Sequence, residues 1–264
     1  MRFPARAGRR ADMDQSATYI YGVVPQDIEV DAEATGVGDP PAPITSIRHG
    51  KIAALVSDVS PGRPLGTPKD LYAHEQLLNA TAAEVPVLPI RFGAVLASRE
   101  AVVEEFLAPY HDEFAAALTE LEGRSQFVIK GRFVEETVLG EILAENPEAA
   151  QLREEISTLP EDAARDHRIR LGEIINQSIE AKRDADTAAM WDQVEPVTVM
   201  QTVRPPSHEL DAVHMAVLVE NTRQDDLDRA VEDLARKWAD QVTLSLFGPM
   251  APYDFIVSQE QDGE

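Results

Sequence analysis

The chain has 264 residues, of which 47 are acidic and 24 basic, so its formal net charge at pH 7 is −23. The negative electrostatic field of such a chain repels nucleic acid phosphates and anionic lipid, which argues against both as partners. The absence of cysteine excludes disulfides, thiolate catalysis and cysteine-based zinc sites. The length suits two modest domains, and an apolar share of 44% allows each of them a buried core.

The N-terminal end carries four arginines within its first ten residues, but no apolar segment follows them, so it is not a secretory signal. No run of the sequence approaches the ~18 apolar residues of a membrane-spanning helix. We expect residues 1–17 to form a disordered tail, with Met13 as an alternative initiator, and we expect a cytoplasmic protein.

Three strands are predicted to follow the tail. Residues 18–24 alternate and are rich in β-forming side chains, whereas residues 25–43 contain four prolines and are predicted as a loop. Residues 44–48 and 51–57 are expected to pair as a tight hairpin, because Gly50 can adopt the positive φ that such turns need.

A helix is predicted to begin after Thr67 as its N-cap, with Pro68 at its first position. Helical spacing puts four residues on one of its faces: Leu71, His74, Leu78 and Ala82. The apolar run of residues 85–91 contains two prolines, which cannot donate to a strand ladder. We therefore expect this run to be a strand at the edge of a sheet.

The next helix is predicted to start at Ser98 and to kink at Pro109. Residues 126–134 are then predicted as one more strand at the edge of the same sheet. This order of elements predicts a ferredoxin-like α+β domain over residues 18–134.

Residues 135–193 are predicted to be a charged helical segment, which Pro147 and Pro160 divide into separate helices. Its last stretch, residues 161–194, has only a thin apolar stripe. Two interpretations stay open for that stripe: it packs against the helix of residues 148–158, or it docks another protein.

Residues 194–264 are predicted to form a C-terminal α+β domain with an extended tail. Strands at 195–203, 214–220 and 241–247 flank a helix at 224–239, for which Thr222 is the expected cap. The fold class that we expect is therefore α+β, with two ferredoxin-like domains joined by the charged helical segment.

The sequence contains no recognisable catalytic motif. His208 and His214 lack the four-residue spacing of a zinc-protease helix, and neither a nucleophile elbow nor a phosphate-binding glycine pattern occurs. His74 and Glu75 are adjacent on a helix, so they point about 100° apart and cannot act together as a base and its orienting group. We predict no catalytic residue, no metal, no cofactor and no enzymatic activity.

Two aromatic segments are candidate contact surfaces. Arg91 and Phe92 are either a core phenylalanine beside an arginine that pairs with a carboxylate such as Glu75, or part of a partner-binding surface. Tyr253 and Phe255 alternate in a segment predicted to be extended, so they can share one face. That tail either packs back onto the N-terminal domain or leaves its aromatic rings in a groove that receives a partner.

Four segments together resemble the gas vesicle protein GvpL/GvpF family. The most specific is AHEQLLNATAAEVPVLPIRFGAVL at residues 73–96, and GPMAPYDF at residues 248–255 is similar to the family's C-terminal motif. Residues 19–24 and 46–57 resemble its opening strand and first hairpin. The resemblance covers roughly residues 18–257. It departs from the family pattern at Ala251, where proline is more usual, and at Gly131-Arg132, which interrupts an otherwise apolar strand.

The resemblance implies a non-enzymatic gas vesicle assembly protein, located in the cytoplasm and at the vesicle. It implies a minor vesicle component that binds the hydrophobic shell protein and limits its aggregation during nucleation, with other gas vesicle accessory proteins as further partners. The partner-binding residues expected are Arg91, Phe92, Tyr253 and Phe255. The alternative that stays open is a small-molecule sensor or enzyme built on paired ferredoxin-like domains, which a pocket with convergent polar groups would favour.

Overall fold

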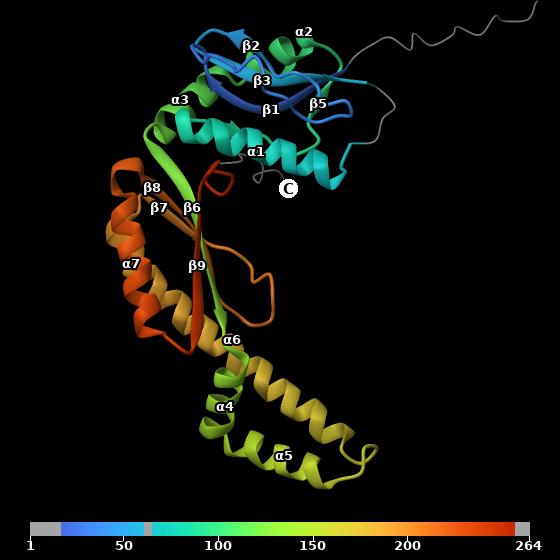
Figure 1. The fold of residues 1–264 in the computed structure, drawn as a ribbon, viewed down its shortest axis with the longest axis vertical. Coiled ribbons are helices and arrows are strands. Elements are labelled where there is room, and N and C mark those ends of the chain that lie inside the picture. Colours follow the sequence, from blue (N-terminus) through green and yellow to red (C-terminus); the bar gives the residue numbers. More distant parts are fainter. Residues whose placement is uncertain (1–16, 61–64, 257–264) are drawn as a thin grey trace, which may run out of the picture. The chain divides into compact units, whose positions relative to one another are not determined.

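The structure is a computed structural model that describes residues 17–60 and 65–256. All of the predicted N-terminal tail except Ala17 lies outside the described residues, and so does Met13. Contacts divide the chain into two compact units. The first holds the residues up to Glu122 together with the segment that starts at Ala251, and the second spans Gly123–Met250. Each unit contains one antiparallel sheet with helices packed on it (Figure 1).

The sheet of the first unit has the strand order β2-β3-β1-β4, with β5 also paired to β1. Its strands are β1 (Ala17–Pro25), β2 (Thr45–His49), β3 (Ile52–Val59), β4 (Leu88–Pro89) and β5 (Val95–Leu96). The hairpin predicted between β2 and β3 is confirmed, with Gly50 at a φ of 57°. The edge position predicted for the proline-containing run is also confirmed, although only Leu88 and Pro89 of that run form ladder pairs.

Helix α1 (Pro68–Glu84) begins as predicted. Thr67 and Asp70 form a reciprocal capping box, and Pro68 occupies the first helical turn. The helix buries His74 and Leu78, whereas Leu71 at the end of the predicted apolar face is 48% exposed. The second predicted helix is interrupted before Pro109. It consists of α2 (Arg99–Ala101), a π-helical stretch η1 (Val102–Leu107) and, after a break, α3 (His111–Leu121).

The sheet of the second unit has the strand order β7-β8-β6-β9. Its strands are β6 (Arg124–Phe133), β7 (Met200–Val203), β8 (Asp211–Glu220) and β9 (Val242–Met250). The placement of residues 126–134 at the edge of the N-terminal sheet was wrong, because β6 lies between β8 and β9. Phe127 and Ile129 are buried in the core that β6 shares with β8, and this burial explains why β6 is a central strand.

The helices of the second unit are α4 (Glu135–Glu145), α5 (Pro147–Thr158), α6 (Arg165–Val194) and α7 (Gln224–Lys237), with short turns η2 (Glu195–Val197) and η3 (Asn221–Arg223). Arg223 stands at the N-cap of α7 and no side chain caps that end, so the cap predicted at Thr222 was wrong. The chain divides neither at 134/135 nor at 193/194, where the domain boundaries were predicted, because α6 packs on β8.

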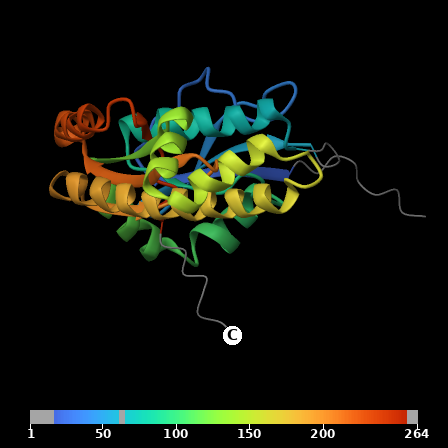
Figure 2. The same cartoon turned by 90° about the horizontal axis from the view of Figure 1, so that it is seen from below.

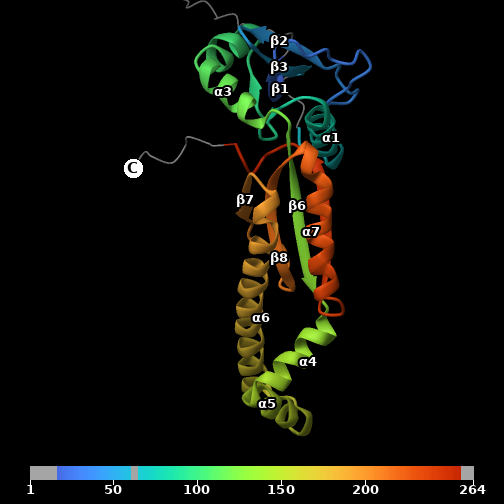
Figure 3. The same ribbon diagram turned by 90° about the vertical axis from the view of Figure 1, so that its left-hand side faces the viewer.

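Helix α6 has two different halves. Its N-terminal half packs along α5, where Arg170 bonds Glu148 and His167 lies 3.1 Å from Glu155 (Figure 2). Its C-terminal half lies against the sheet, with Met190 and Val194 in the core beside α7 (Figure 3). Ile175 and Ile179 of the apolar stripe lie in a core with Val138 and Ile142 of α4, so part of the stripe packs on a helix that neither interpretation named. Among the described helices, none combines the length and the apolar character that spanning a membrane requires.

Candidate functional site

The residues between β4 and β5 form a loop that leaves the edge of the first sheet. Backbone hydrogen bonds to β1 lie at both ends of this loop. Ile90 N–H donates to Tyr21 O at 2.8 Å, and Ile20 N–H donates to Ala94 O at 2.9 Å. Arg91, Phe92 and Gly93 lie between these two bonds. We call residues 90–94 the Arg91 loop. Gly93 has a φ of 97°, a conformation that glycine adopts without strain.

A hydrogen-bond network centred on His74 of α1 holds this loop. Gly93 N–H donates to Tyr19 Oη at 3.1 Å, and Tyr19 Oη lies 2.9 Å from His74 Nδ1. His74 Nε2 lies 3.1 Å from Ile90 O and 3.0 Å from Tyr253 Oη. A carbonyl oxygen can only accept, so Nε2 carries the proton and Nδ1 accepts from the Tyr19 hydroxyl.

Aromatic rings surround the same histidine. Tyr21 stacks on His74 with ring centroids 5.5 Å apart, and Phe92 meets His74 edge-on, also at 5.5 Å. Tyr19 contacts both Tyr21 and Phe92. We call Tyr19, Tyr21, His74, Phe92 and Tyr253 the His74 cluster. It joins β1, α1, the Arg91 loop and the C-terminal tail within the first unit.

Burial keeps this cluster uncharged near neutral pH. It lowers the pKa of His74, and it raises the pKa values of Tyr19 and Tyr21. Burial also raises the pKa of Tyr253 to about 12, with a smaller contribution from the negative charge of Glu75. The cluster therefore acts through packing and neutral hydrogen bonds. Within the described ranges, no three histidine, aspartate or glutamate side chains lie close enough together to hold a metal ion.

The tail returns to the first unit through turns. Ala251 is fully buried and its N–H donates to Asn79 Oδ1 at 3.0 Å, so the tail packs on α1. Tyr253 N–H donates to Ala251 O, and Phe255 N–H donates to Pro252 O. The prediction that this segment is extended was therefore wrong.

The structure brings three of the four predicted contact residues together. Phe92 is half-buried and Tyr253 is 39% exposed, and both contact His74, while the exposed Arg91 directly precedes Phe92 in the loop. Among the residues that the structure describes, the Arg91 guanidinium has no ion pair or hydrogen bond, so the pairing suggested with Glu75 is absent. Phe255 is half-buried and is not among the rings that contact this cluster. Sequence reasoning missed Tyr19 and Tyr21, although their spacing of two residues on a strand signals a shared face.

Lowering the pH from 7 to 5 is expected to destabilise the first unit. The folded-state pKa of His74 is lowered. Neutral His74 therefore stabilises the folded state fully above the unfolded pKa of about 6.5, and this stabilisation is lost as the pH falls below that value. Urea unfolding, followed by tyrosine circular dichroism at several pH values, measures this. His74→Phe keeps a ring in place but cannot be protonated, so its stability should be lower at pH 7 and should vary less with pH. An equal pH slope in both chains would contradict the assignment.

Comparison with known proteins places this geometry in a family. The model of the family described as "Gas vesicle synthesis protein GvpL/GvpF" matches residues 17–257. Gas vesicle protein F of Streptomyces sp. (strain CB03234) is 28% identical, over 91% of this chain and 99% of that protein. Gas vesicle protein L of the same strain is 27% identical, over 92% and 94%.

Two crystal structures share the fold. The gas vesicle protein GvpF from Anabaena sp. PCC7120 superposes with a TM-score of 0.73 at 21% identity, covering 90% of this chain and 97% of that one. GvpF from Microcystis aeruginosa gives a TM-score of 0.72, also at 21% identity, covering 90% and 98%. Because the family model spans nearly all of the described residues, this chain belongs to the gas vesicle synthesis protein GvpL/GvpF family.

Proposed function

We propose that this chain is a gas vesicle assembly protein without enzymatic activity. In this proposal it is a minor vesicle component that binds the small hydrophobic shell protein and limits its aggregation during nucleation, in the cytoplasm and at the vesicle, together with other accessory proteins. The observation that carries the proposal is the family match over residues 17–257. Relatives named as gas vesicle proteins F and L align over nearly their whole length, which supports a vesicle-related role for the complete chain.

The surface of the first unit suits such a client. Apolar subunits aggregate unless their exposed faces are covered, and aromatic and arginine side chains are the usual anchors of protein interfaces. Arg91 is exposed next to Phe92 in the loop, and contacts with His74 hold the partly exposed rings of Phe92 and Tyr253 in position. We propose these residues, with Phe255 further along the tail, as the client-binding surface. The net charge of −23 keeps the complex soluble.

We also propose that the two units share a ferredoxin-like plan. In the first sheet β4 pairs with β1, and β2 lies at the opposite edge. In the second sheet β9 pairs with β6, and β7 lies at the opposite edge, so the strand order is the same in both. Helices make both crossovers in the second unit. In the first unit the loop of residues 26–44 replaces the first crossover helix. Such sheets have open edges, and pairing of an edge strand with the client is the contact that we favour.

Arg91→Ala is expected to reduce vesicle yield at least about tenfold while leaving the melting temperature of the first unit unchanged. The reason is that a charge-assisted hydrogen bond to a partner contributes roughly 1.5–3 kcal/mol, whereas Arg91 has no ion pair within the described chain. The measurement is vesicle yield in cells whose own copy is deleted, alongside the amount of shell protein that stays soluble on co-expression.

Lys69→Ala is the matched control, because Lys69 is another exposed cation of the first unit. It should leave the yield unchanged, and Arg91→Lys should restore only part of it, since lysine lacks the planar fork of arginine. Normal vesicles with Arg91→Ala would refute the assignment of Arg91, and parallel loss of folding and vesicles would show that Arg91 is structural. Normal flotation of cells that lack the whole chain would refute the function itself.

A further inference from the structure

Strand β7 presents unpaired backbone groups at the edge of the second sheet. It is the outermost strand and pairs only with β8. Arg204 N–H donates to His214 O at 2.8 Å, so by alternation Thr202 and Met200 also direct their backbone groups toward β8. Gln201 and Val203 therefore direct theirs away from the sheet. Among the described residues, neither makes a backbone hydrogen bond to another element.

The side chains of these two residues lie on the helix-covered face of the sheet. Gln201 is paired with Val217 and Val203 with Met215, and both of those partners belong to the core beneath α6 and α7. Val203 is nevertheless 52% exposed, because no strand lies beyond it. Gln201 Oε1 is buried and has no hydrogen-bond partner within the described chain. The sheet thus ends at β7 with an apolar side chain uncovered.

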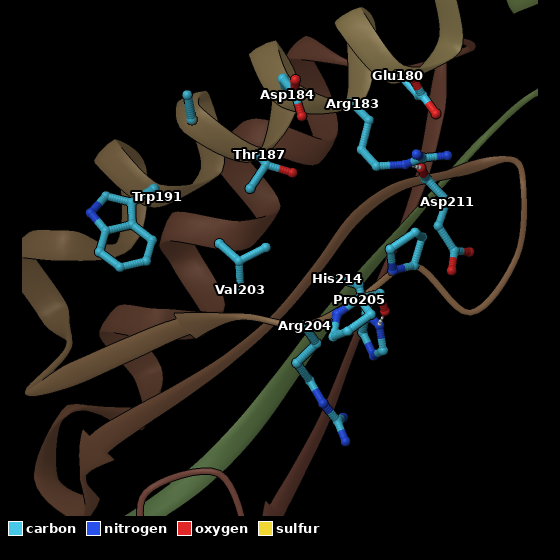
Figure 4. Close-up of a pocket in the computed structure, with 12 residues that line it drawn as sticks. Glu180, Arg183, Asp184, Thr187, Trp191, Val203, Arg204, Pro205, Asp211 and His214 are labelled. Carbon is cyan, nitrogen blue, oxygen red and sulfur yellow. Dashed lines mark hydrogen bonds between the residues drawn. The ribbon is translucent and has the colours of Figure 1, made fainter. Parts of the chain in front are cut away.

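A groove of about 740 Å³ runs between this edge and α6 (Figure 4). Thr187, Ala188 and Trp191 line it from the helix, and Val203 lines it from the strand. Figure 4 shows Thr187 and Trp191 on the side of α6 that faces Val203, while the Arg204 side chain extends away from the helix. The floor at this end of the groove is apolar.

On the α6 side of the groove the accessible charge is negative, whereas Arg204 lines the opposite side. Arg183 is held by the carbonyls of Glu209 and Asp211, each at 2.6 Å, so its guanidinium is directed into the chain itself. Glu180 and Asp184 line the groove, are exposed and make no ion pair within the described ranges. They continue the stripe of Thr187 and Trp191 along one side of α6.

We propose that β7 and this groove bind an extended segment of a partner protein, which adds to the sheet as a further strand. Every second residue of that segment faces α6. A strand advances about 6.7 Å in two residues and a helical turn about 5.4 Å, so successive inward residues follow the stripe turn by turn. The inward residues of the segment that face Trp191 and Thr187 are apolar, and those that face Asp184 and Glu180 are basic.

The charge of the chain makes a second copy a poor occupant. Two copies would bring together molecules of net charge −23, each with the acidic stripe of Glu180 and Asp184 on α6. The occupant is therefore a different chain that carries positive charge near an apolar strand. This inference goes beyond the proposed function, since it concerns another surface and does not require that the occupant be the shell protein.

The test uses a blocked, fluorescent eight-residue peptide and the full-length chain. The inward-facing positions of the peptide carry two valines followed by two lysines, and the alternate positions are threonine. Fluorescence anisotropy should show saturable binding that Val203→Pro weakens at least about tenfold. Proline is tolerated on an edge strand where the N–H faces outward, so thermal unfolding should be little changed. Ala188→Lys, at an exposed helix position, should weaken binding as strongly by filling the groove.

Asp192→Lys is the matched control, because Asp192 is exposed on α6 but does not line the groove, and it should change the dissociation constant by less than about twofold. A peptide with glutamates in place of the lysines should bind at least about tenfold more weakly. The proposal is overturned if the peptide is not bound at about 1 mM, an affinity of roughly −4 kcal/mol. It is also overturned if Val203→Pro and Ala188→Lys bind like the parent chain, or if sedimentation shows a dimer that Val203→Pro dissociates.

Discussion

Asp70→Ala is expected to lower the free energy of unfolding of the first unit by about 3 kcal/mol, because it removes one half of the capping box and leaves several partly buried donors without an acceptor. Asp70 is only 2% exposed. Its Oδ1 accepts from Gly38 N–H, and its Oδ2 accepts from the N–H groups of Gly66 and Thr67 and from the Thr67 hydroxyl. Alanine leaves all of these donors without their acceptor.

The same bonds make the effect dependent on pH. The hydrogen bond from Gly38, followed by those of the capping box, lowers the pKa of Asp70 from 3.8 to about 2. A lowered carboxyl pKa stabilises the folded state above the unfolded value and ceases to do so as the pH falls. The difference in stability between the parent chain and Asp70→Ala should therefore be full above pH ~4 and should shrink toward pH ~2.

Urea unfolding followed by tyrosine circular dichroism measures the loss, because all five tyrosines lie in the first unit and both tryptophans in the second. Asp58→Ala serves as the control. Asp58 is exposed and forms a long, solvent-exposed ion pair of 3.7 Å with Arg99, so its loss should lower the free energy of unfolding by less than about 1 kcal/mol. If both variants unfolded at the same urea concentration, the role of Asp70 in joining the loop to α1 would be wrong.

Local chemistry explains which elements could be predicted from sequence. The start of α1 follows from Thr67 and Pro68, because a cap and its first turn are set by adjacent residues. The edge position of β4 follows from the missing N–H groups of two prolines. Strand β6 was recognised but assigned to the wrong sheet. Its partners β8 and β9 begin at Asp211 and Val242, and the composition of a strand does not specify which distant strand it joins.

The candidate site shows the same limit. Arg91, Phe92 and Tyr253 could be selected because prolines and aromatic residues mark their segments. The group that links them could not, since Tyr19 and Tyr253 lie 55 and 179 residues from His74 along the chain. Helical spacing placed His74 correctly on the buried side of α1, but it carries no information about which hydroxyls will meet the ring.

Ending the chain at Met250 is expected to destabilise the first unit by about 3 kcal/mol, through two lost hydrogen bonds and lost burial of the tail. Removing the tail takes away the donor to Asn79 and the Tyr253 hydroxyl beside His74. It also uncovers the surface beneath Ala251, which packs against the core of this unit. Strand β9 ends at Met250, so the second sheet keeps all of its strands.

The tyrosine signal should consequently melt earlier by on the order of 10 °C, whereas tryptophan fluorescence should report an unchanged second unit. A chain ending at Ile256 is the matched control, since it retains every tail contact that the structure describes. If the two truncations lowered the tyrosine transition equally, the stabilising residues would lie beyond Ile256. If the chain ending at Met250 melted like the parent, the tail would rest on the first unit without contributing to its stability, and Tyr253 would owe its position to His74 alone.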